Sequence, residues 1–229
     1  MFWEMQREEI MAEHKRIFAG LLKADIYGIT AEEYSRGRSN IEVVAQMIEA
    51  GIMVIQYREK EKSDRRKYEE CRKIREMTRK AGVSFIVNDS VDLAMLVDAD
   101  GVHLGQDDLP PGVVKKLAGE KMFIGLSTHS PAQAEAALKL GVDYIGVGPI
   151  FATNTKKDVC EPVGLEYLDY VVKNIRLPCV AIGGIKEHNI AEVYRRGARC
   201  IALVTEIVGA PDIGAKVRDL RAAIQQKSF

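Results

Sequence analysis

Short apolar runs rich in β-branched residues alternate along the chain with longer stretches of helical periodicity. Each run has the length of a buried strand, and each longer stretch repeats its apolar positions every three to four residues. The runs predict eight strands, over residues 25–30, 52–59, 83–89, 100–105, 122–127, 142–150, 178–184 and 199–205. Strands that alternate with helices in this way form a parallel sheet that is buried on both faces.

The ends of the helical stretches carry their own signals. Residues 130–141 begin with Ser130 as a helix N-cap, continue with Pro131 in the first turn and end at Gly141. A glycine also stands just before the strand in EAGIMVI, KAGVSFI, KLGVDYI and RRGARCI, as short helix-to-strand connections require. No G-x-G-x-x-G motif follows the first strand, so the repeated units predict a (β/α)8 TIM barrel rather than an open dinucleotide-binding sheet.

The length of 229 residues fits one such barrel. We expect a single domain over residues 1–229, with residues 1–22 forming an extra N-terminal helix before the first strand. Charges interrupt this N-terminal segment, so it predicts neither a signal peptide nor a membrane-spanning helix. The 33 Lys and Arg residues balance the 33 Asp and Glu residues, and this neutral sum argues against a nucleic-acid binder.

The four cysteines are scattered and form no C-x-x-C pair, which excludes a redox motif or a zinc site of known spacing. We expect each of them to be a small buried or half-buried apolar residue. They are Cys71, Cys160, Cys179 and Cys200. Together with the absence of a signal peptide, they predict a cytoplasmic protein that is not attached to a membrane.

The second predicted strand ends in a run of polar residues. Strand alternation puts Gln56, Arg58 and Lys60 on one face, with Tyr57 and Glu59 on the other. The active face of a (β/α)8 barrel is built from the C-terminal strand ends, and buried unpaired cations are costly. This convergence therefore predicts an anion site. The alternative is an ion-pair network that uses Glu59 or another nearby acid.

The next two strands end in carboxylates. Asn88 and Asp89 end the third strand, and Asp107 and Asp108 follow the fourth. Oxygen ligands from neighbouring strand ends suit Mg²⁺, and a metal ion facing cations is typical of a pyrophosphate site. The alternative is that Asp108 caps the helix that begins after Pro110.

Polar groups at the remaining strand ends extend this face. Ser127 ends the fifth strand, and His129 is a candidate general base, whereas His103 is expected to be a hydrogen-bonded core residue. The loop over 148–158 carries hydroxyl and Lys groups that suit a phosphate contact, a lid or a solvated loop. After the seventh strand, Gly183 and Gly184 let backbone N–H groups approach a second anion.

These motifs resemble those of the thiamine phosphate synthase (thiamin phosphate pyrophosphorylase) family, and the resemblance runs from Ile26 to about Lys216. It rests on residues 56–60 (QYREK), 87–89 (VND), 101–108 (GVHLGQDD), 148–151 (GPIF), 153–156 (TNTK) and 181–185 (AIGGI). It implies a (β/α)8 transferase of thiamine biosynthesis. Hydroxymethylpyrimidine diphosphate would lose pyrophosphate to the ring nitrogen of hydroxyethylthiazole phosphate, by dissociative substitution with Mg²⁺.

The resemblance also implies a role for each matching residue. Asp89 and Asp108 would hold Mg²⁺, and Gln56 would contact the pyrimidine. The pyrophosphate would be held by Arg58, Lys60, Asn88 and Lys156. Ser127 would lie beside the reacting groups, so that Arg58, Lys60, Ser127 and Lys156 form the expected catalytic set. The thiazole phosphate would contact Thr153, Thr155, Gly184, Val204 and Thr205.

Two departures and two rival functions stay open at this point. Thr205 stands where the family usually has Ser, and the N-terminal extension has no assigned role. A thiazole tautomerase with the same barrel would need a phosphate site and a base such as His129, but not Arg58, Lys60, Asp89 and Asp108 together. A silent barrel that senses a phosphate ligand is the second rival. Small-molecule substrates are the expected partners, and a homo-oligomer remains open.

Overall fold

Eight parallel strands close into a barrel in chain order, with β8 paired to β1. The computed structural model describes residues 20, 23–153, 155 and 160–225. The strands are β1 Ile26–Ile29, β2 Val54–Tyr57, β3 Ser84–Asn88, β4 Gly101–Leu104, β5 Phe123–Thr128, β6 Tyr144–Val147, β7 Cys179–Ala181 and β8 Cys200–Leu203. Each lies within or closely overlaps one predicted run, and the (β/α)8 fold is confirmed.

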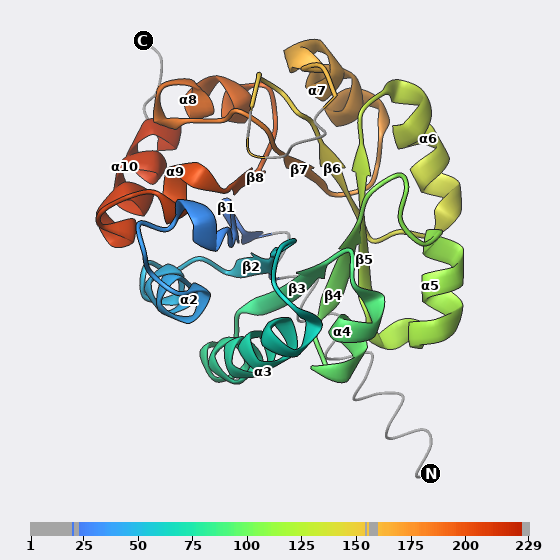
Figure 1. Ribbon diagram of the computed structural model, residues 1–229. Helices are drawn as coiled ribbons and strands as arrows, with labels where there is room; N and C mark the ends of the chain where they lie inside the picture. Colours follow the sequence, from blue (N-terminus) through green and yellow to red (C-terminus); the bar gives the residue numbers. More distant parts are fainter. Residues whose placement is uncertain (1–19, 21–22, 154, 156–159, 226–229) are drawn as a thin grey trace, which may run out of the picture.

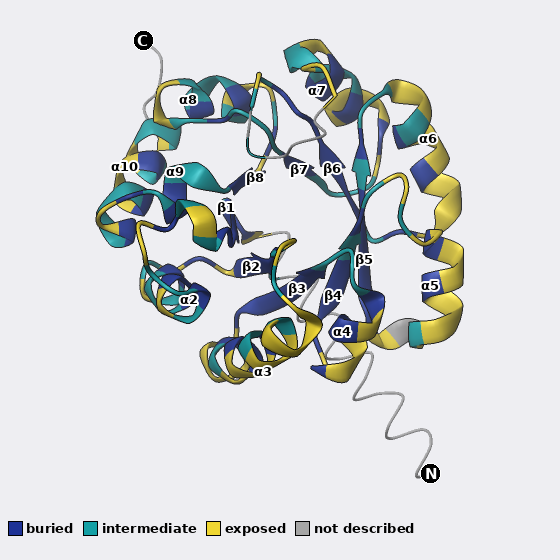
Figure 2. Cartoon of the chain, viewed as in Figure 1, coloured by how far each residue is buried: buried dark blue, intermediate teal, exposed yellow. Residues whose placement is uncertain are grey.

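Helices follow the strands and surround the barrel (Figure 1). They are α2 Asn40–Glu49, α3 Asp64–Ala81, α4 Val91–Leu96, α5 Pro111–Ala118, α6 Pro131–Leu140, α7 Gly164–Asn174, α8 Glu187–Arg195, α9 Thr205–Val208 and α10 Ile213–Gln225. Two short 3-10 turns, η1 Glu32–Tyr34 and η2 Gly119–Lys121, complete the described elements. Figure 2 shows the strands buried and the exposed residues gathered on the outer faces of the helices.

The helix ends match their sequence signals. The Ser130 hydroxyl accepts a hydrogen bond from the Gln133 backbone N–H at 3.3 Å and caps α6. Gly82 and Gly141 end α3 and α6 with φ of +67° and +68°. Glycine is favoured here because a Cβ atom disfavours the left-handed region, and each turn leads the chain directly into the next strand.

Side chains of alternating positions form two layers. The barrel interior is a small cluster of mainly apolar residues: Ala24, Tyr27, Ile29, Val54, Ile86, Tyr144, Val180, Cys200 and Ala202. A larger cluster fills the space between the strands and the helices. Because side chains point to opposite faces along a strand, Gln56, Asn88 and Ser127 take inward positions at the C-terminal ends of β2, β3 and β5. The barrel therefore brings these three polar residues to one mouth.

Three expectations concern the ends and the cysteines. The predicted N-terminal extension over 1–22 lies, except for Gly20, outside the described residues. None of the described helices combines the length and the apolarity needed to cross a membrane. Cys71 and Cys200 are buried and Cys179 is half-buried, as predicted. The prediction was wrong for Cys160, which is exposed because it lies in the polar loop before α7 and not in a strand.

Candidate active site

The last two side chains of β2 point to opposite faces of the sheet, as the alternation predicts. Gln56 points into the barrel, where its Nε2 donates a hydrogen bond to the Tyr27 hydroxyl at 3.0 Å. Tyr57 points outwards and donates to Glu70 Oε2 of α3 at 2.8 Å. Burial, together with this carboxylate, raises the pKa of the Tyr57 phenol. Tyr57 is thus a structural residue of the outer layer, and Gln56 belongs to the barrel mouth.

Arg58, directly after β2, is a buried residue. The residue is 9% exposed, and its Nε has no hydrogen-bond partner. Among the described residues its side chain makes no ion pair either. Glu59 does not neutralise it, because Glu59 Oε1 accepts from the Glu32 backbone N–H at 2.8 Å and from Asn40 Nδ2 at 2.9 Å. The alternative of an ion-pair network through Glu59 is therefore wrong, and Arg58 is a buried cation without a counter-charge among the described residues.

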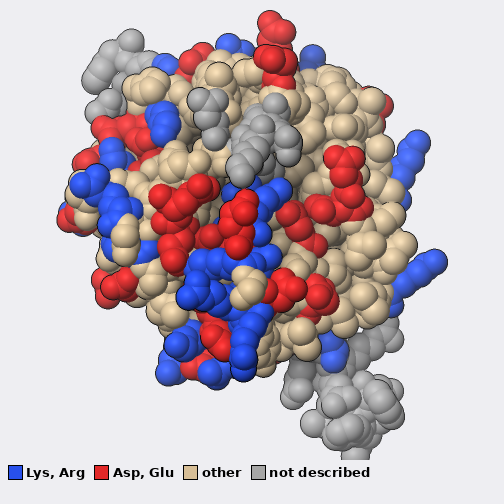
Figure 3. All heavy atoms as spheres, viewed as in Figure 1, with Lys and Arg blue, Asp and Glu red and all other residues tan. Residues whose placement is uncertain are grey.

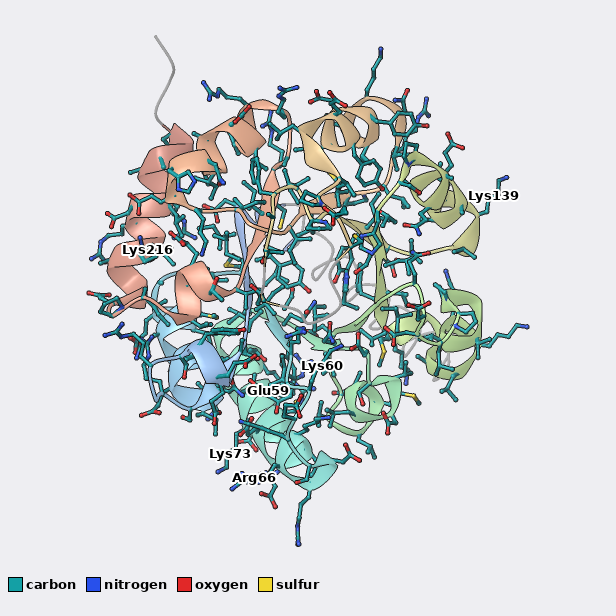
Figure 4. The ribbon with its side chains drawn as sticks, turned by 45° about the horizontal axis from the view of Figure 1, so that its top comes forward. Glu59, Lys60, Arg66, Lys73, Lys139 and Lys216 are labelled. Atoms are coloured by element: carbon teal, nitrogen blue, oxygen red, sulfur yellow. The ribbon has the colours of Figure 1, made fainter. Side chains whose placement is uncertain are left out.

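Lys60 extends the positive charge to the rim of the barrel mouth. It is exposed and, within the described part of the chain, makes no ion pair. Figure 4 shows Lys60 near the barrel mouth, whereas Lys139 and Lys216 lie on the outer helices. Basic side chains gather near the middle of the face in Figure 3, over β2 and α3, with acidic side chains to either side. The neutral total charge of the chain is therefore unevenly distributed on this face.

The carboxylates lie at the ends of the two neighbouring strands. Asp89 has a left-handed backbone with φ of +62°, and its N–H donates to the His103 carbonyl of β4 at 2.9 Å. Asp108 Oδ2 accepts from the Gly105 backbone N–H at 2.6 Å and closes the turn after β4. The N-cap of α5 is Pro110, so the alternative that Asp108 caps that helix is wrong. Asp107 is exposed beside it.

A cleft of about 550 Å³ beside the barrel mouth brings Lys60, Asn88 and Asp89 to one lining. Leu109, next to Asp108, lines the same cleft. The inward-pointing Gln56 does not line it. Arg58 and Asp108 do not line it either, whereas the outward-pointing Tyr57 and Glu59 do, so the cleft lies on the outer side of the strand ends.

The residues present fit a divalent ion that is shared with a substrate. No three His, Cys, Asp or Glu side chains of the described chain lie close enough together to enclose a metal ion. Mg²⁺ usually takes one or two carboxylates, with waters and substrate phosphate oxygens as its other ligands. Asp89 and Asp108 supply that number of hard oxygen donors from adjacent strand ends. Such an ion would be held jointly by the chain and by a bound diphosphate.

Ser127 is the next-to-last residue of β5, three strands along the barrel from Gln56. Its hydroxyl is 2.9 Å from Nε2 of His103, and its carbonyl accepts from Gln106 Nε2 at 2.6 Å. His103 is half-buried with both ring nitrogens in hydrogen bonds, which confirms the expectation of a hydrogen-bonded core residue. His129 Nδ1 lies 2.5 Å from the Gly148 carbonyl, so this nitrogen carries the proton and donates it.

A second group of predicted residues meets on the other side of the mouth. The Ile150 and Phe151 N–H groups donate to the carbonyls of Ile182 and Gly183 at 2.9 and 3.0 Å. Gly184 has φ of +62°, and a Cβ there would lie 2.5 Å from the Ala152 carbonyl oxygen. The glycine pair is thus required by the close approach of the loop after β6, a reason that the sequence did not indicate.

The remaining predicted contacts belong to the same region. Thr153 and Thr155, both half-buried, join their hydroxyls at 3.1 Å. Val204 and Thr205 follow β8 and are also half-buried. Lys156 lies outside the described residues, and so do residues 154, 157 and 158 of the loop over 148–158, for which a phosphate contact or a lid is predicted.

Four residues were missed as functional candidates. Lys186 Nζ donates to the Thr205 hydroxyl at 3.2 Å and pairs with Glu206 at 3.1 Å, which adds a cation to the group around Gly184. Its signal in the sequence is a Lys two residues after the glycine pair. Tyr27 and Tyr144 join Gln56 to His103 inside the barrel. Their inward positions were predictable from alternation, but their mutual contact was not. The fourth is Gln106, which holds the Ser127 carbonyl.

Comparison with known proteins connects this geometry to a family. A family model described as thiamine monophosphate synthase matches residues 26–207. The chain belongs to the thiamine monophosphate synthase family. The match covers all eight strands, the carboxylates after β3 and β4, and the glycine pair after β7. The fold and the family thus agree over the whole barrel.

Individual relatives support the same assignment. The chain is 80% identical over 213 residues to a thiamine-phosphate synthase of Pelotomaculum thermopropionicum, covering 93% of this chain and 98% of the relative. It is 57% identical over 203 residues to the thiamine-phosphate synthase of Lawsonia intracellularis, covering 89% and 94% of the two chains. The solved thiamine phosphate pyrophosphorylase of Pyrococcus furiosus superposes with a TM-score of 0.81 at 36% identity, over 89% and 96% of the chains. As a member of this family, the chain is a transferase.

Proposed function

We propose that this transferase joins hydroxymethylpyrimidine diphosphate to hydroxyethylthiazole phosphate, giving thiamine phosphate and pyrophosphate with the help of Mg²⁺. Family membership supports the reaction class. The observation that carries the proposal is Arg58, a buried residue whose side chain has no counter-charge among the described residues. Burying a cation without a counter-charge destabilises the folded state, and an anionic substrate that pairs with it best explains why this cation is present.

The diphosphate end of the site combines several cations with two carboxylates. Arg58 binds the diphosphate from the inner side and Lys60 from the rim, while Asp89 and Asp108 would hold Mg²⁺ at the neighbouring strand ends. The ion, when bound, supplies positive charge that stabilises the departing pyrophosphate. The residues proposed to hold the diphosphate are Arg58, Lys60, Asn88 and Lys156.

The bond changes require no protein nucleophile. The bond between the pyrimidine methylene carbon and the diphosphate oxygen breaks, and its electron pair leaves with pyrophosphate. The electron-rich aminopyrimidine stabilises the resulting cation, and the lone pair of the thiazole nitrogen then forms the new C–N bond. Catalysis rests on orientation and on stabilisation of the leaving charge. Gln56 orients the pyrimidine, and Ser127 lies beside the reacting groups.

The thiazole phosphate is proposed to bind on the other side of the mouth. The hydroxyls of Thr153 and Thr155 and the backbone after β7 and β8, at Gly184, Val204 and Thr205, form this second anion site. Lys186 lies beside this second site, where its Nζ donates to the Thr205 hydroxyl and pairs with Glu206. Since Thr205 contributes through its backbone, its difference from the Ser usual in the family has little effect.

Release of pyrophosphate tests the proposal directly. Purified protein mixed with both substrates and Mg²⁺ should release pyrophosphate and form thiamine phosphate in equal amounts, and neither substrate alone should do so. Arg58→Ala should lower kcat/KM by roughly 10²-fold or more, because it removes charge stabilisation of the leaving group. Arg196→Ala is the control, since Arg196 forms an exposed ion pair with Asp169 on the outer helices. No pyrophosphate from the wild-type chain would contradict the proposal.

The tautomerase alternative has a separate signature. It predicts proton exchange on the thiazole phosphate at a rate that changes neither on Mg²⁺ removal nor in Asp108→Ala. The synthase proposal predicts that both changes lower the rate of pyrophosphate release. Measuring both rates on the same preparations distinguishes the two reactions.

A further inference from the structure

A chain of hydrogen bonds crosses the barrel interior from β2 to β5. Gln56 Nε2 donates to the Tyr27 hydroxyl at 3.0 Å, and the Tyr27 and Tyr144 hydroxyls are 3.0 Å apart. The Tyr144 hydroxyl lies 3.0 Å from His103 Nδ1, and His103 Nε2 lies 2.9 Å from the Ser127 hydroxyl. The two ends of this chain, Gln56 and Ser127, are both residues proposed to meet the substrates.

The barrel is built to hold this chain. Tyr27 and Tyr144 are each 1% exposed and lie in an otherwise mainly apolar layer. A Cβ at Gly125 would lie 2.2 Å from Cζ of Tyr144 and 2.5 Å from Nδ1 of His103. Only a glycine at that inward position of β5 leaves room for the pair. Gly146 of β6 clears the other side of the imidazole, where a Cβ would lie 3.3 Å from Cε1 of His103.

The donors and acceptors fix the direction of the chain. Burial raises the pKa of both Tyr27 and Tyr144, so each phenol keeps its proton. An amide N–H only donates, so the Tyr27 oxygen accepts from Gln56, and the arrangement in which every link shares one proton has Tyr27 donating to Tyr144. Tyr144 then has one proton left for His103 Nδ1. In this arrangement His103 is the tautomer with its proton on Nε2, and Nε2 donates to Ser127.

This direction has consequences at both ends. At Ser127 the hydroxyl oxygen accepts from the imidazole, so its own proton is directed away from His103. His103 cannot act as a base toward Ser127, because the nitrogen that faces the serine already carries a proton. At Gln56 the amide nitrogen is held by Tyr27. The remaining Oε1 makes no hydrogen bond with the described residues and is not sealed from solvent.

We propose that Tyr27, Tyr144 and His103 are positioning residues that fix Gln56 as a hydrogen-bond acceptor and Ser127 as a hydrogen-bond donor at the barrel mouth. The inference rests on the proposed function. An acceptor at Gln56 matches an amino group on the pyrimidine ring. A donor at Ser127 matches the negative charge that grows on the leaving diphosphate oxygen. The chain thus orders the two groups as a unit, and each link strengthens the next.

The tautomer of His103 tests the direction without any need for activity. Two-bond ¹H–¹⁵N correlations on ¹⁵N-histidine-labelled protein report which ring nitrogen carries the proton. The chain has four histidines, and a His103→Gln sample assigns the signal of His103. We expect the Nε2–H tautomer in the wild type and a mixture of tautomers in Tyr144→Phe. An Nδ1–H tautomer in the wild type would overturn the proposal, because the hydrogen bonds would then be donated in the direction from Ser127 to Gln56.

Kinetics test whether the chain of hydrogen bonds acts on the substrate through Ser127. Tyr144→Phe should lower kcat about tenfold, less than the 10²–10³-fold loss that follows removal of a donor touching the reacting atoms. The KM for thiazole phosphate should not change. In a Ser127→Ala background, Tyr144→Phe should lower kcat less than about twofold, because its route to the substrate is already removed. Equal losses in both backgrounds would overturn the proposal.

A matched tyrosine separates positioning from stability. Tyr167 is 5% exposed and donates to the Thr128 hydroxyl at 2.7 Å, but it lies in the outer layer. Tyr167→Phe should lower the melting temperature without changing kcat. A tenfold loss of kcat in Tyr167→Phe as well would show that any lost buried hydroxyl has this effect. Absence of thiamine phosphate synthesis by the wild type would contradict the proposed function, and the tautomer measurement would still decide the direction of the chain.

Discussion

Two arginines of equal burial are predicted to have opposite effects on stability. Arg58 is 9% exposed and Arg75 is 8% exposed, and in both the Nε atom is buried without a partner. They differ in charge compensation. Arg75 Nη1 pairs with Asp100 Oδ2 at 2.8 Å, and the Asp100 side chain is 2% exposed. No such partner faces Arg58 among the described residues.

Replacement of each by Met keeps the apolar stem and removes the charge. Arg58→Met relieves an unsatisfied buried polar group, which is worth about 1–3 kcal/mol. Arg75→Met instead leaves the Asp100 carboxylate buried without its cation, which costs about 3–5 kcal/mol. At about 2–4 °C per kcal/mol for a chain of this size, the melting temperature should rise by about 2–12 °C in Arg58→Met and fall by about 6–20 °C in Arg75→Met.

Thermal unfolding without ligand measures both changes, and added Mg²⁺ and pyrophosphate provide a second readout. The ligands should raise the melting temperature of the wild type and of Arg75→Met. They should raise the melting temperature of Arg58→Met much less, because ligands stabilise only a protein that binds them. A fall in Arg58→Met as large as that in Arg75→Met would refute the reasoning. Arg58 would then be a structural residue with a counter-charge, not a cation held for substrate.

Two further predictions concern a carboxylate and a glycine. Burial alone would raise the pKa of Glu70, but the hydrogen bonds it accepts, first among them that from Lys62, hold it below the ordinary value of 4.5. The Glu70 carboxylate therefore stabilises the folded state above about pH 4.5, and this stabilisation is lost as the pH falls through the lower pKa of the folded state. In Glu70→Gln the free energy of unfolding should depend less on pH in that range. Replacement of the exposed Glu69 by Gln should leave the pH dependence unchanged. Gly184→Ala should lower the free energy of unfolding, measured with denaturant, more than Gly82→Ala does. Both glycines have positive φ (+62° and +67°), so both replacements strain the backbone. Only at Gly184 would the new Cβ also meet neighbouring backbone, at 2.5 Å. Equal losses at the two glycines would show that backbone strain alone sets the cost.

The sequence by itself determined the fold and the positions of one group of candidate site residues. The alternation of short apolar runs with helical stretches predicts eight buried parallel strands, because period and burial follow directly from side-chain spacing. The same spacing assigns Gln56 and Tyr57 to opposite faces and puts Asp89 and Asp108 after neighbouring strands. These are local properties, so they can be read from the order of residues and from the rule that strand ends form the active face.

Tertiary structure decided which of those residues have partners. Whether Arg58 is neutralised depends on where Glu59 turns, and Glu59 bonds to the loop after β1 instead. Tyr27 and Tyr144 are 117 residues apart in sequence and meet only because the barrel closes. The reason for glycine at 125 and 184 lies in atoms of a neighbouring strand and of the loop after β6, which approach within 2.2–2.5 Å of the missing Cβ. Contacts of this kind depend on the closure of the sheet, and spacing along the chain does not encode them.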